Sequence, residues 1–161
     1  MSLVIWSVII IVLDQLSKYW VRSNLAGKDA VVIIKDFFYL NYVENKGAAF
    51  GFLNDSELGS IFLKIFSLIL TIGLIFLGAK LKHRRLRFAL ATIIAGSIGN
   101  LLDRFILSFV TDFLSFHFGP YIFPSFNIAD SCIVLGVFYF AFLIIFDKEA
   151  DESLTAVLEK N

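Results

Sequence analysis

Long apolar segments dominate the pattern of hydrophobic and polar positions along the chain. A helix of about 20 apolar residues crosses the hydrocarbon core of a bilayer. We predict four membrane-spanning helices, at about residues 3–21, 58–79, 88–106 and 129–146. The first segment lacks a basic start and carries Asp14, Gln15 and Lys18, whereas the apolar core of a secretory signal is uninterrupted. We therefore interpret it as a retained helix.

Two segments between the predicted spans, residues 22–57 and 107–128, mix apolar and polar positions. Within the first, the β-branched and aromatic runs Val31–Ile34 and Phe37–Leu40 predict short strands at about residues 31–43. These strands are too short and too polar to cross a membrane. We expect them to form a small sheet beside the helices.

The remaining segments complete the expected architecture. Gly119, Pro120 and Pro124 are expected to interrupt regular structure in the second mixed segment. The polar, acidic tail at residues 147–161 predicts a frayed helix. We expect residues 1–161 to form one integral membrane domain, mainly α-helical.

Composition agrees with a membrane protein, because 58% of the 161 residues are hydrophobic. The formal net charge is zero, so nothing indicates a nucleic-acid partner. The single cysteine, Cys132, excludes an intrachain disulfide. No cysteine or histidine cluster has metal-ligand spacing, so we expect no metal and no cofactor. A monomer is the default expectation.

A dense basic loop gives the membrane topology. Residues 80–87 hold five lysines and arginines together with His83. Such loops stay in the cytoplasm. Four spans then place both termini in the cytoplasm and both mixed segments outside it.

This topology brings most of the polar residues of the spans to one depth, near the outer membrane interface. Helical spacing also puts Asp14 on the same face as Lys18, and Asn100 on the same face as Arg104. Scattered, solvated charges would not collect at one level, so we predict a polar site there. Its candidates are Asp14, Lys18, Asn45, Gly47, Asn100, Asp103, Arg104, Asp112, Asn127, Ala129 and Asp130.

Asp112 and Asp130 are the candidates with the most specific chemistry. An acid at membrane depth is costly, and two acids that share a site hold one proton between them. One carboxylate can then activate water while the other protonates a carbonyl, which hydrolyses an amide without a metal. The structural alternative is that each acid caps a helix or meets the interface, as Asp130 would at a helix start. From spacing alone the two interpretations are evenly balanced.

The other polar residues have competing explanations. Arg104 can hold a carboxylate through two hydrogen bonds, and Asn100 and Asp103 favour a supporting role in the site. For Asp14 and Lys18 we favour a buried pair that locks the first span to the bundle. Asn45 and Gly47 are most often simply a turn.

A nucleophilic serine or cysteine is a weaker alternative. Ser131 or Cys132 would need a base, and a pair of Ser131 with Lys18 is the conceivable form. His83 lies in the cytoplasmic loop, and nothing fixes His117. We expect Cys132 to be a small packing residue.

Five stretches of the chain together resemble the lipoprotein signal peptidases (signal peptidase II), the bacterial aspartic membrane proteases. They run from the first predicted span to the fourth. In order they are Asp14-Gln15-Leu16-Ser17-Lys18, Glu44-Asn45-Lys46-Gly47-Ala48-Ala49-Phe50-Gly51, Gly99-Asn100-Leu101-Leu102-Asp103-Arg104, Val110-Thr111-Asp112-Phe113 and Phe126-Asn127-Ile128-Ala129-Asp130-Ser131. Thr111 departs from the family pattern, in which a second valine is common.

The resemblance implies an activity and a location. Members cleave the signal peptide of prolipoproteins just before a cysteine that carries diacylglycerol, at the outer face of the bacterial cytoplasmic membrane. Prolipoproteins and membrane lipids are the implied partners. The implied fold has four transmembrane helices, a small extracytoplasmic β-cradle and a short extracytoplasmic helix or loop over the site. The implied catalytic pair is Asp112 and Asp130, and the implied lining or supporting residues are Asp14, Lys18, Asn45, Gly47, Asn100, Arg104, Asn127 and Ala129.

Two other classes of function stay open from the residues themselves. A small proton-coupled transporter would also use intramembrane carboxylates, but it predicts acids near the midplane and repeated halves. A structural membrane subunit would use the polar residues only for helix association. Such a subunit would keep its function after Asp112→Asn.

Overall fold

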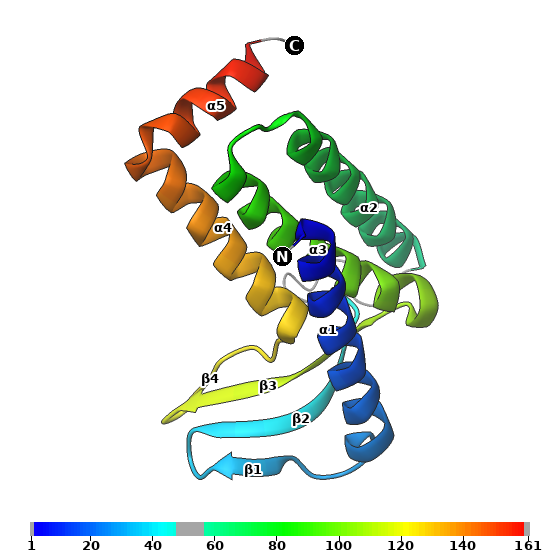
Figure 1. Cartoon of the computed structure of the whole chain (residues 1–161). Coiled ribbons are helices and arrows are strands. Elements are labelled where there is room, and N and C mark those ends of the chain that lie inside the picture. Colours follow the sequence, from blue (N-terminus) through cyan, green and yellow to red (C-terminus); the bar gives the residue numbers. More distant parts are fainter. Residues whose placement is uncertain (1, 48–56, 160–161) are drawn as a thin grey trace.

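Four long helices form the body of the protein (Figure 1). The computed structural model describes residues 2–47 and 57–159. All four helices are long and apolar enough to cross a membrane, which confirms the four predicted spans. They are α1 (Leu3–Leu25), α2 (Glu57–Lys80), α3 (Arg84–Leu107) and α4 (Ile128–Phe146).

The helix α3 is the centre of the bundle, because it packs against α1, α2 and α4. Small residues allow this close approach, as predicted for the stripe of Ala91, Ala95 and Gly99. Ala95 is fully buried, and a side chain added at Gly99 would meet Asp14 of α1 and Ala129 of α4. Leu, Ile and Phe side chains on the outer faces of α1, α2 and α4 are exposed, as expected for surfaces that contact lipid.

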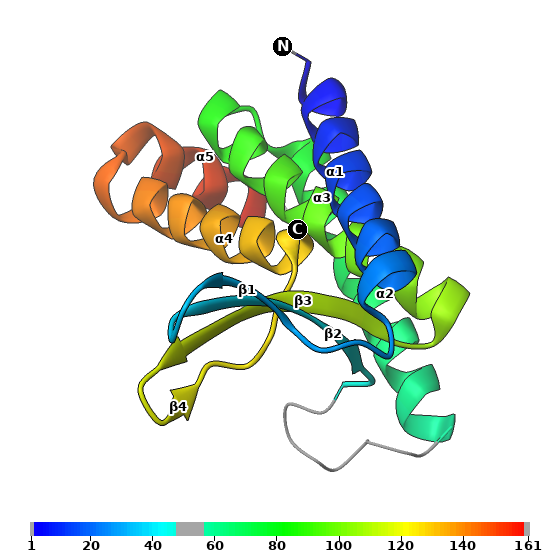
Figure 2. The same ribbon diagram turned by 90° about the horizontal axis from the view of Figure 1, so that it is seen from below.

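A four-stranded antiparallel sheet lies below the helices, in the order β1-β2-β3-β4 (Figures 1 and 2). The first two strands occupy the predicted region. The third was not predicted, because Gly119 and Pro120 suggested irregular structure, whereas Gly119 lies in the turn between β3 and β4. The strands are β1 (Val31–Ile34), β2 (Phe38–Asn45), β3 (Val110–Phe118) and β4 (Tyr121–Ile122).

Pairing between β2 and β3 joins two segments that are far apart in the sequence. Val43 lies opposite Asp112, and Asn45 lies opposite Val110, after an irregularity between Leu40 and Val43. This register carries Asn45 to Asp112. Residues 48–56, which include part of the predicted Glu44–Gly51 motif, lie outside the described residues.

The basic residues lie at the end of the bundle away from the sheet (Figure 1). The connection between α2 and α3 is shorter than predicted, because α3 already begins at Arg84. The tail forms a helix, α5 (Lys148–Leu158), instead of fraying. Its Ala150 is fully buried in a cluster with Leu86 and Leu143, which fixes α5 to this end of the bundle.

Candidate active site

Asp112 lies in β3 and is almost completely buried, with 1% of its surface exposed. Its two carboxyl oxygens accept hydrogen bonds from Asn127 Nδ2 at 2.7 Å and from Asn45 Nδ2 at 2.8 Å. Burial raises the pKa of the Asp112 carboxyl from 3.8 to about 6, and the charge of Asp130 acts in the same direction. The hydrogen bonds from Asn45 and Asn127 oppose this rise. Asp112 can therefore exchange a proton close to neutral pH.

Asp130 lies in the first turn of α4 and is half-buried. It forms a capping box with Asn127, in which Asp130 Oδ2 accepts from the Asn127 backbone N–H at 3.2 Å. The helix-capping role that we considered from the sequence is therefore real. Its other oxygen, Oδ1, accepts from Asn100 Nδ2 at 2.7 Å. Asp130 thus has a cap on one side and a contact with α3 on the other.

Asn127 connects the two acids, since its side-chain amide donates to Asp112 and its backbone N–H donates to Asp130. The fold brings it there through the preceding residue. Phe126 pairs with Leu114 of β3, with a backbone hydrogen bond of 2.8 Å from Leu114 N to Phe126 O. The chain therefore leaves the sheet beside Asp112 and enters α4 at once. Two acids that are 18 positions apart in the sequence consequently share one asparagine.

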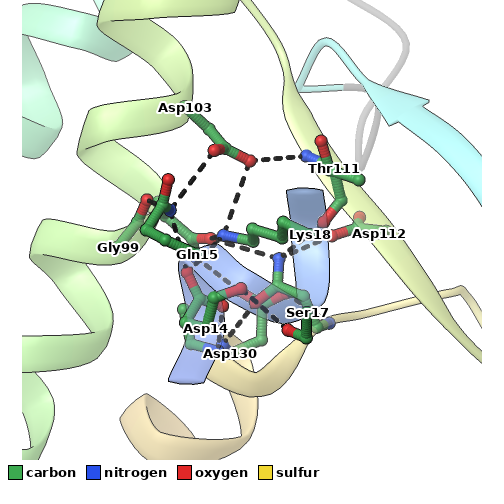
Figure 3. Close-up of polar contacts among 12 residues, drawn as sticks. Asp14, Gln15, Ser17, Lys18, Gly99, Asp103, Thr111, Asp112 and Asp130 are labelled. Carbon is green, nitrogen blue, oxygen red and sulfur yellow. Dashed lines mark hydrogen bonds and ion pairs between the residues drawn. The ribbon is translucent and has the colours of Figure 1, made fainter. Parts of the chain in front are cut away.

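A buried charge cluster supports this pair from behind (Figure 3). The ammonium group of Lys18 lies 2.9 Å from Asp14 Oδ2 and 3.5 Å from Asp103 Oδ2, and no part of Lys18 is exposed. It also donates to Asn100 Oδ1 at 2.9 Å. Asp14 in turn accepts from the Ala129 backbone N–H at 2.9 Å. The predicted pairing of Asp14 with Lys18 is present, and it ties α1 to both α3 and α4.

Three residues of this cluster were not among the predicted site residues: Gln15, Arg22 and Thr111. Gln15 Nε2 donates to Gly99 O at 3.0 Å, and it also contacts Asp14 and Asp103. Arg22 lies 3.6 Å from Asp103 and donates to Thr111 Oγ1 at 3.0 Å. Arg22 follows Lys18 by four residues on the same helical face, but the predicted span ended before it. A longer first helix would have identified it.

Thr111 is the position that departs from the family pattern, and its hydroxyl group has a partner. It is fully buried, and its Oγ1 accepts the hydrogen bond from Arg22. Its backbone N–H donates to Asp103 Oδ2 at 2.9 Å. A valine at this position would keep the backbone contact but would leave Arg22 without this acceptor.

Asn45 and Gly47 form a turn and also reach the site. Gly47 N donates to Asn45 Oδ1 at 2.8 Å, which leaves the Asn45 amide nitrogen facing Asp112. Gly47 has φ of 96°, which is a conformation that favours glycine, and an added side chain would collide with Leu63. The turn therefore orients one of the two donors to Asp112.

Arg104 is the predicted site residue without a direct contact to either acid. Its charge interacts electrostatically with Asp130 and Asp112, but within residues 2–47 and 57–159 its guanidinium forms no ion pair. It lines a small cavity of about 10 Å³. The other described residues at this cavity are Asn45, Ser60, Leu63, Ser108 and Phe109.

The geometry does not favour the alternative of a serine or cysteine nucleophile. Ser131 Oγ donates to the backbone oxygen of Asn127 at 3.0 Å, and Lys18 is held by Asp14, Asp103 and Asn100 instead. Cys132 is partly buried in α4. Across the described part of the chain, no group of three or more histidine, cysteine, aspartate or glutamate side chains is arranged to hold a metal ion.

The model of the signal peptidase II family, Peptidase_A8, matches residues 6–146. The chain belongs to this family. The lipoprotein signal peptidase of Desulforapulum autotrophicum is 39% identical over 149 residues, which cover 90% of this chain and 92% of that protein. The lipoprotein signal peptidase of Clostridium tetani is 40% identical over 136 residues, which cover 84% and 86%.

A solved structure agrees with these relatives. A bacterial membrane enzyme, determined by the in meso method at 2.3 Å resolution, superposes with a TM-score of 0.80 at 28% identity. The match covers 90% of this chain and 88% of that one. The resemblance and the membrane fold inferred from the sequence are therefore confirmed. This signal peptidase II family member is a multi-pass membrane protein and a peptidase, which also argues against the transporter and the structural subunit.

Proposed function

We propose that this protein removes the signal peptide from prolipoproteins, by hydrolysing the peptide bond before the diacylglyceryl-modified cysteine. Family membership supports prolipoproteins as the substrate class. The observation that carries the aspartic mechanism is the convergence of Asp112 and Asp130 on Asn127, at 2.7 Å and 3.2 Å. Neither acid forms an ion pair with a described residue, whereas the neighbouring acids Asp14 and Asp103 are both paired with Lys18.

The chemistry follows from two acids with one proton between them. The ionised carboxylate accepts a proton from the attacking water, and the protonated one donates to the peptide carbonyl. A tetrahedral intermediate forms, and proton return to the amide nitrogen then breaks the carbon–nitrogen bond. The pair titrates as a unit, so either acid can hold the proton. The pKa of about 6 for Asp112 supports proton exchange near neutral pH.

The asparagines have two roles in this proposal. Asn45, Asn100 and Asn127 donate to the acids, which fixes the directions of the carboxylates. A peptide bond within a membrane helix is already hydrogen-bonded, so the substrate must be held extended near the cut. Side chains near the pair, including Arg104, are candidates to bind the released backbone groups.

The proposed location is the outer face of the bacterial cytoplasmic membrane, with both termini in the cytoplasm. The basic residues 80–87 and the sheet lie at opposite ends of the bundle (Figure 1). Basic segments stay in the cytoplasm, so the sheet and the acids would face outward. A lipid-anchored cysteine also sits at an interface, with its acyl chains in the bilayer. The cleavage site would therefore meet the acids at the same depth.

A cleavage assay in lipid tests the proposal. The substrates are a prolipoprotein peptide with and without diacylglycerol on its cysteine, and the enzymes are wild type, Asp112→Asn and Asp130→Asn. Each variant removes ionisation from one acid with little change in shape. We expect wild type to cut only the lipidated peptide, before the cysteine, and each variant to lose at least about 100-fold in rate.

Folding of the variants is checked by thermal unfolding, and Asp36→Asn serves as a matched control. Asp36 lies in the turn between β1 and β2, away from the candidate site. Near-normal cleavage by either folded site variant would contradict the aspartic mechanism. Equal cleavage of the peptide without lipid would contradict the proposed substrate.

A further inference from the structure

A second cavity lies at the opposite end of the bundle from the acids. It has a volume of about 420 Å³ and lies where α1 and α3 begin, beside α4. None of its residues belongs to the candidate active site. The cavity, called here the basic groove, is lined by Leu3, Trp6, Arg84, Arg85, Phe88 and Tyr139.

Three aromatic rings form the apolar part of the basic groove. Trp6 stacks on Phe88 with ring centroids 5.2 Å apart, and Phe88 meets the edge of Tyr139 at 6.5 Å. The indole N–H of Trp6 donates to Thr92 Oγ1 at 2.9 Å, so it needs no partner from outside. Tyr139 precedes the end of α4 by seven residues, which is a depth of about 10 Å. The rings therefore lie at the depth of lipid acyl chains.

The rim of the basic groove carries uncompensated positive charge. Arg84 and Arg85 open α3, whose first turn contains no acidic residue. Cations at a helix N-terminus are unfavourable, because the helix dipole is positive there. Among the described residues, the carboxylate paired with residues 83–87 is Asp147, which lies 3.5 Å from Arg85 and 3.8 Å from His83. Arg84 forms no ion pair with any described residue.

We propose that the basic groove binds a phospholipid with an anionic headgroup. Arg84 and Arg85 hold the phosphate, and an acyl chain lies over Trp6, Phe88 and Tyr139. Arginine binds phosphate through paired hydrogen bonds, and basic pockets between membrane helices suit anionic headgroups. A secretory signal segment is a poorer occupant, because its start is positively charged and the two arginines would repel it. The proposal does not depend on which leaflet this end of the bundle meets.

Fluorescence of Trp6 provides a direct test. The protein has two tryptophans, and Trp20 is an exposed residue toward the other end of α1. The Trp20→Phe protein therefore reports on Trp6 alone. In phosphatidylcholine-containing micelles, the probe is phosphatidylglycerol or phosphatidylcholine, each with the same brominated acyl chains. We expect phosphatidylglycerol to quench Trp6 at a concentration about tenfold lower.

Charge-matched variants separate a site from general attraction. In the Trp20→Phe background, Arg84→Gln with Arg85→Gln removes the rim, while Lys82→Gln with Arg87→Gln removes two charges nearby that do not line the basic groove. We expect only the first pair to abolish the preference for phosphatidylglycerol. All four side chains are exposed, so folding should survive, and circular dichroism checks it.

Three results would overturn the proposal. Equal quenching by the two lipids shows that the groove has no preference for an anion. Equal loss in both variant pairs shows diffuse attraction to the basic segment instead of a site. Reversal of the quenching by millimolar inorganic phosphate shows a site for a free anion, whereas a bound phospholipid stays in place.

Discussion

The ammonium group of Lys18 donates to the side-chain oxygen of Asn100 at 2.9 Å. An ammonium group cannot accept a hydrogen bond, so this contact fixes which end of the Asn100 amide faces Lys18. The amide nitrogen must then face the other way, where it donates to Asp130 at 2.7 Å. A buried lysine on α1 therefore sets the direction of a donor to an acid on α4, although Lys18 forms no hydrogen bond or ion pair with Asp130.

Asn100→Asp tests this orientation. The variant keeps an oxygen toward Lys18 but turns the donor toward Asp130 into a second carboxylate. Like charges at this distance disturb the proton shared by the pair. We expect kcat/KM for the lipidated peptide to fall about 100-fold while the protein stays folded. Asn24→Asp, at an exposed position of α1, makes the same chemical change as a control. Equal activity in the two variants would contradict a role for the Asn100 amide.

The activity of Asn45→Ala should respond differently to pH. Asn45 donates to Asp112 Oδ2, which favours the ionised form and lowers the pKa of Asp112. Its removal raises that pKa above about 6, with Lys18 and Asp130 still acting on it. A hydrogen bond to a charged group contributes about 1.5 kcal/mol, so the limb of the pH–rate profile due to Asp112 should move up by about one pH unit. A profile that is unchanged, or that moves to lower pH, would contradict this assignment.

The sequence could supply the elements and the chemistry of this site better than its geometry. The pairing of Asp14 with Lys18 follows from helical spacing alone, and it is present. The contact of Asn45 with Asp112 could not be derived, because it depends on a long-range strand pairing with an irregular register. Arg104 shows the opposite case. Its spacing suggested a direct contact with a carboxylate, yet side-chain direction at the end of α3 leaves it beside a small cavity.

Gly99→Ala should destabilise the protein far more than Gly73→Ala. An alanine Cβ at Gly99 would lie 2.6 Å from Asp14 Oδ2 and 3.3 Å from Ala129 Cβ. At Gly73, in α2, an added Cβ meets nothing within 4 Å. Overpacking costs about 1–3 kcal/mol, so thermal unfolding in detergent should show a clear loss for the first variant only. A similar unfolding temperature for both would mean that α1 and α4 do not approach α3 this closely.

The buried charges should stabilise the fold only as a balanced set. Lys18→Met leaves Asp14 without its cation, and an unpaired buried charge costs about 3–5 kcal/mol. This corresponds to a fall of about 10 °C in the unfolding temperature. Lys28→Met, at an exposed position, provides the control.

Adding Asp14→Asn to Lys18→Met should restore part of the lost stability. The double variant removes one charge of each sign, and the asparagine introduced at position 14 can still accept from the Ala129 backbone N–H through its side-chain oxygen. Asp103 keeps Arg22 and the Thr111 backbone N–H as partners. The coupling energy in a double-mutant cycle should therefore be favourable by about 2 kcal/mol. If the two losses simply add, the ammonium and the carboxylate do not compensate each other, and Lys18 contributes through packing of its carbon chain instead.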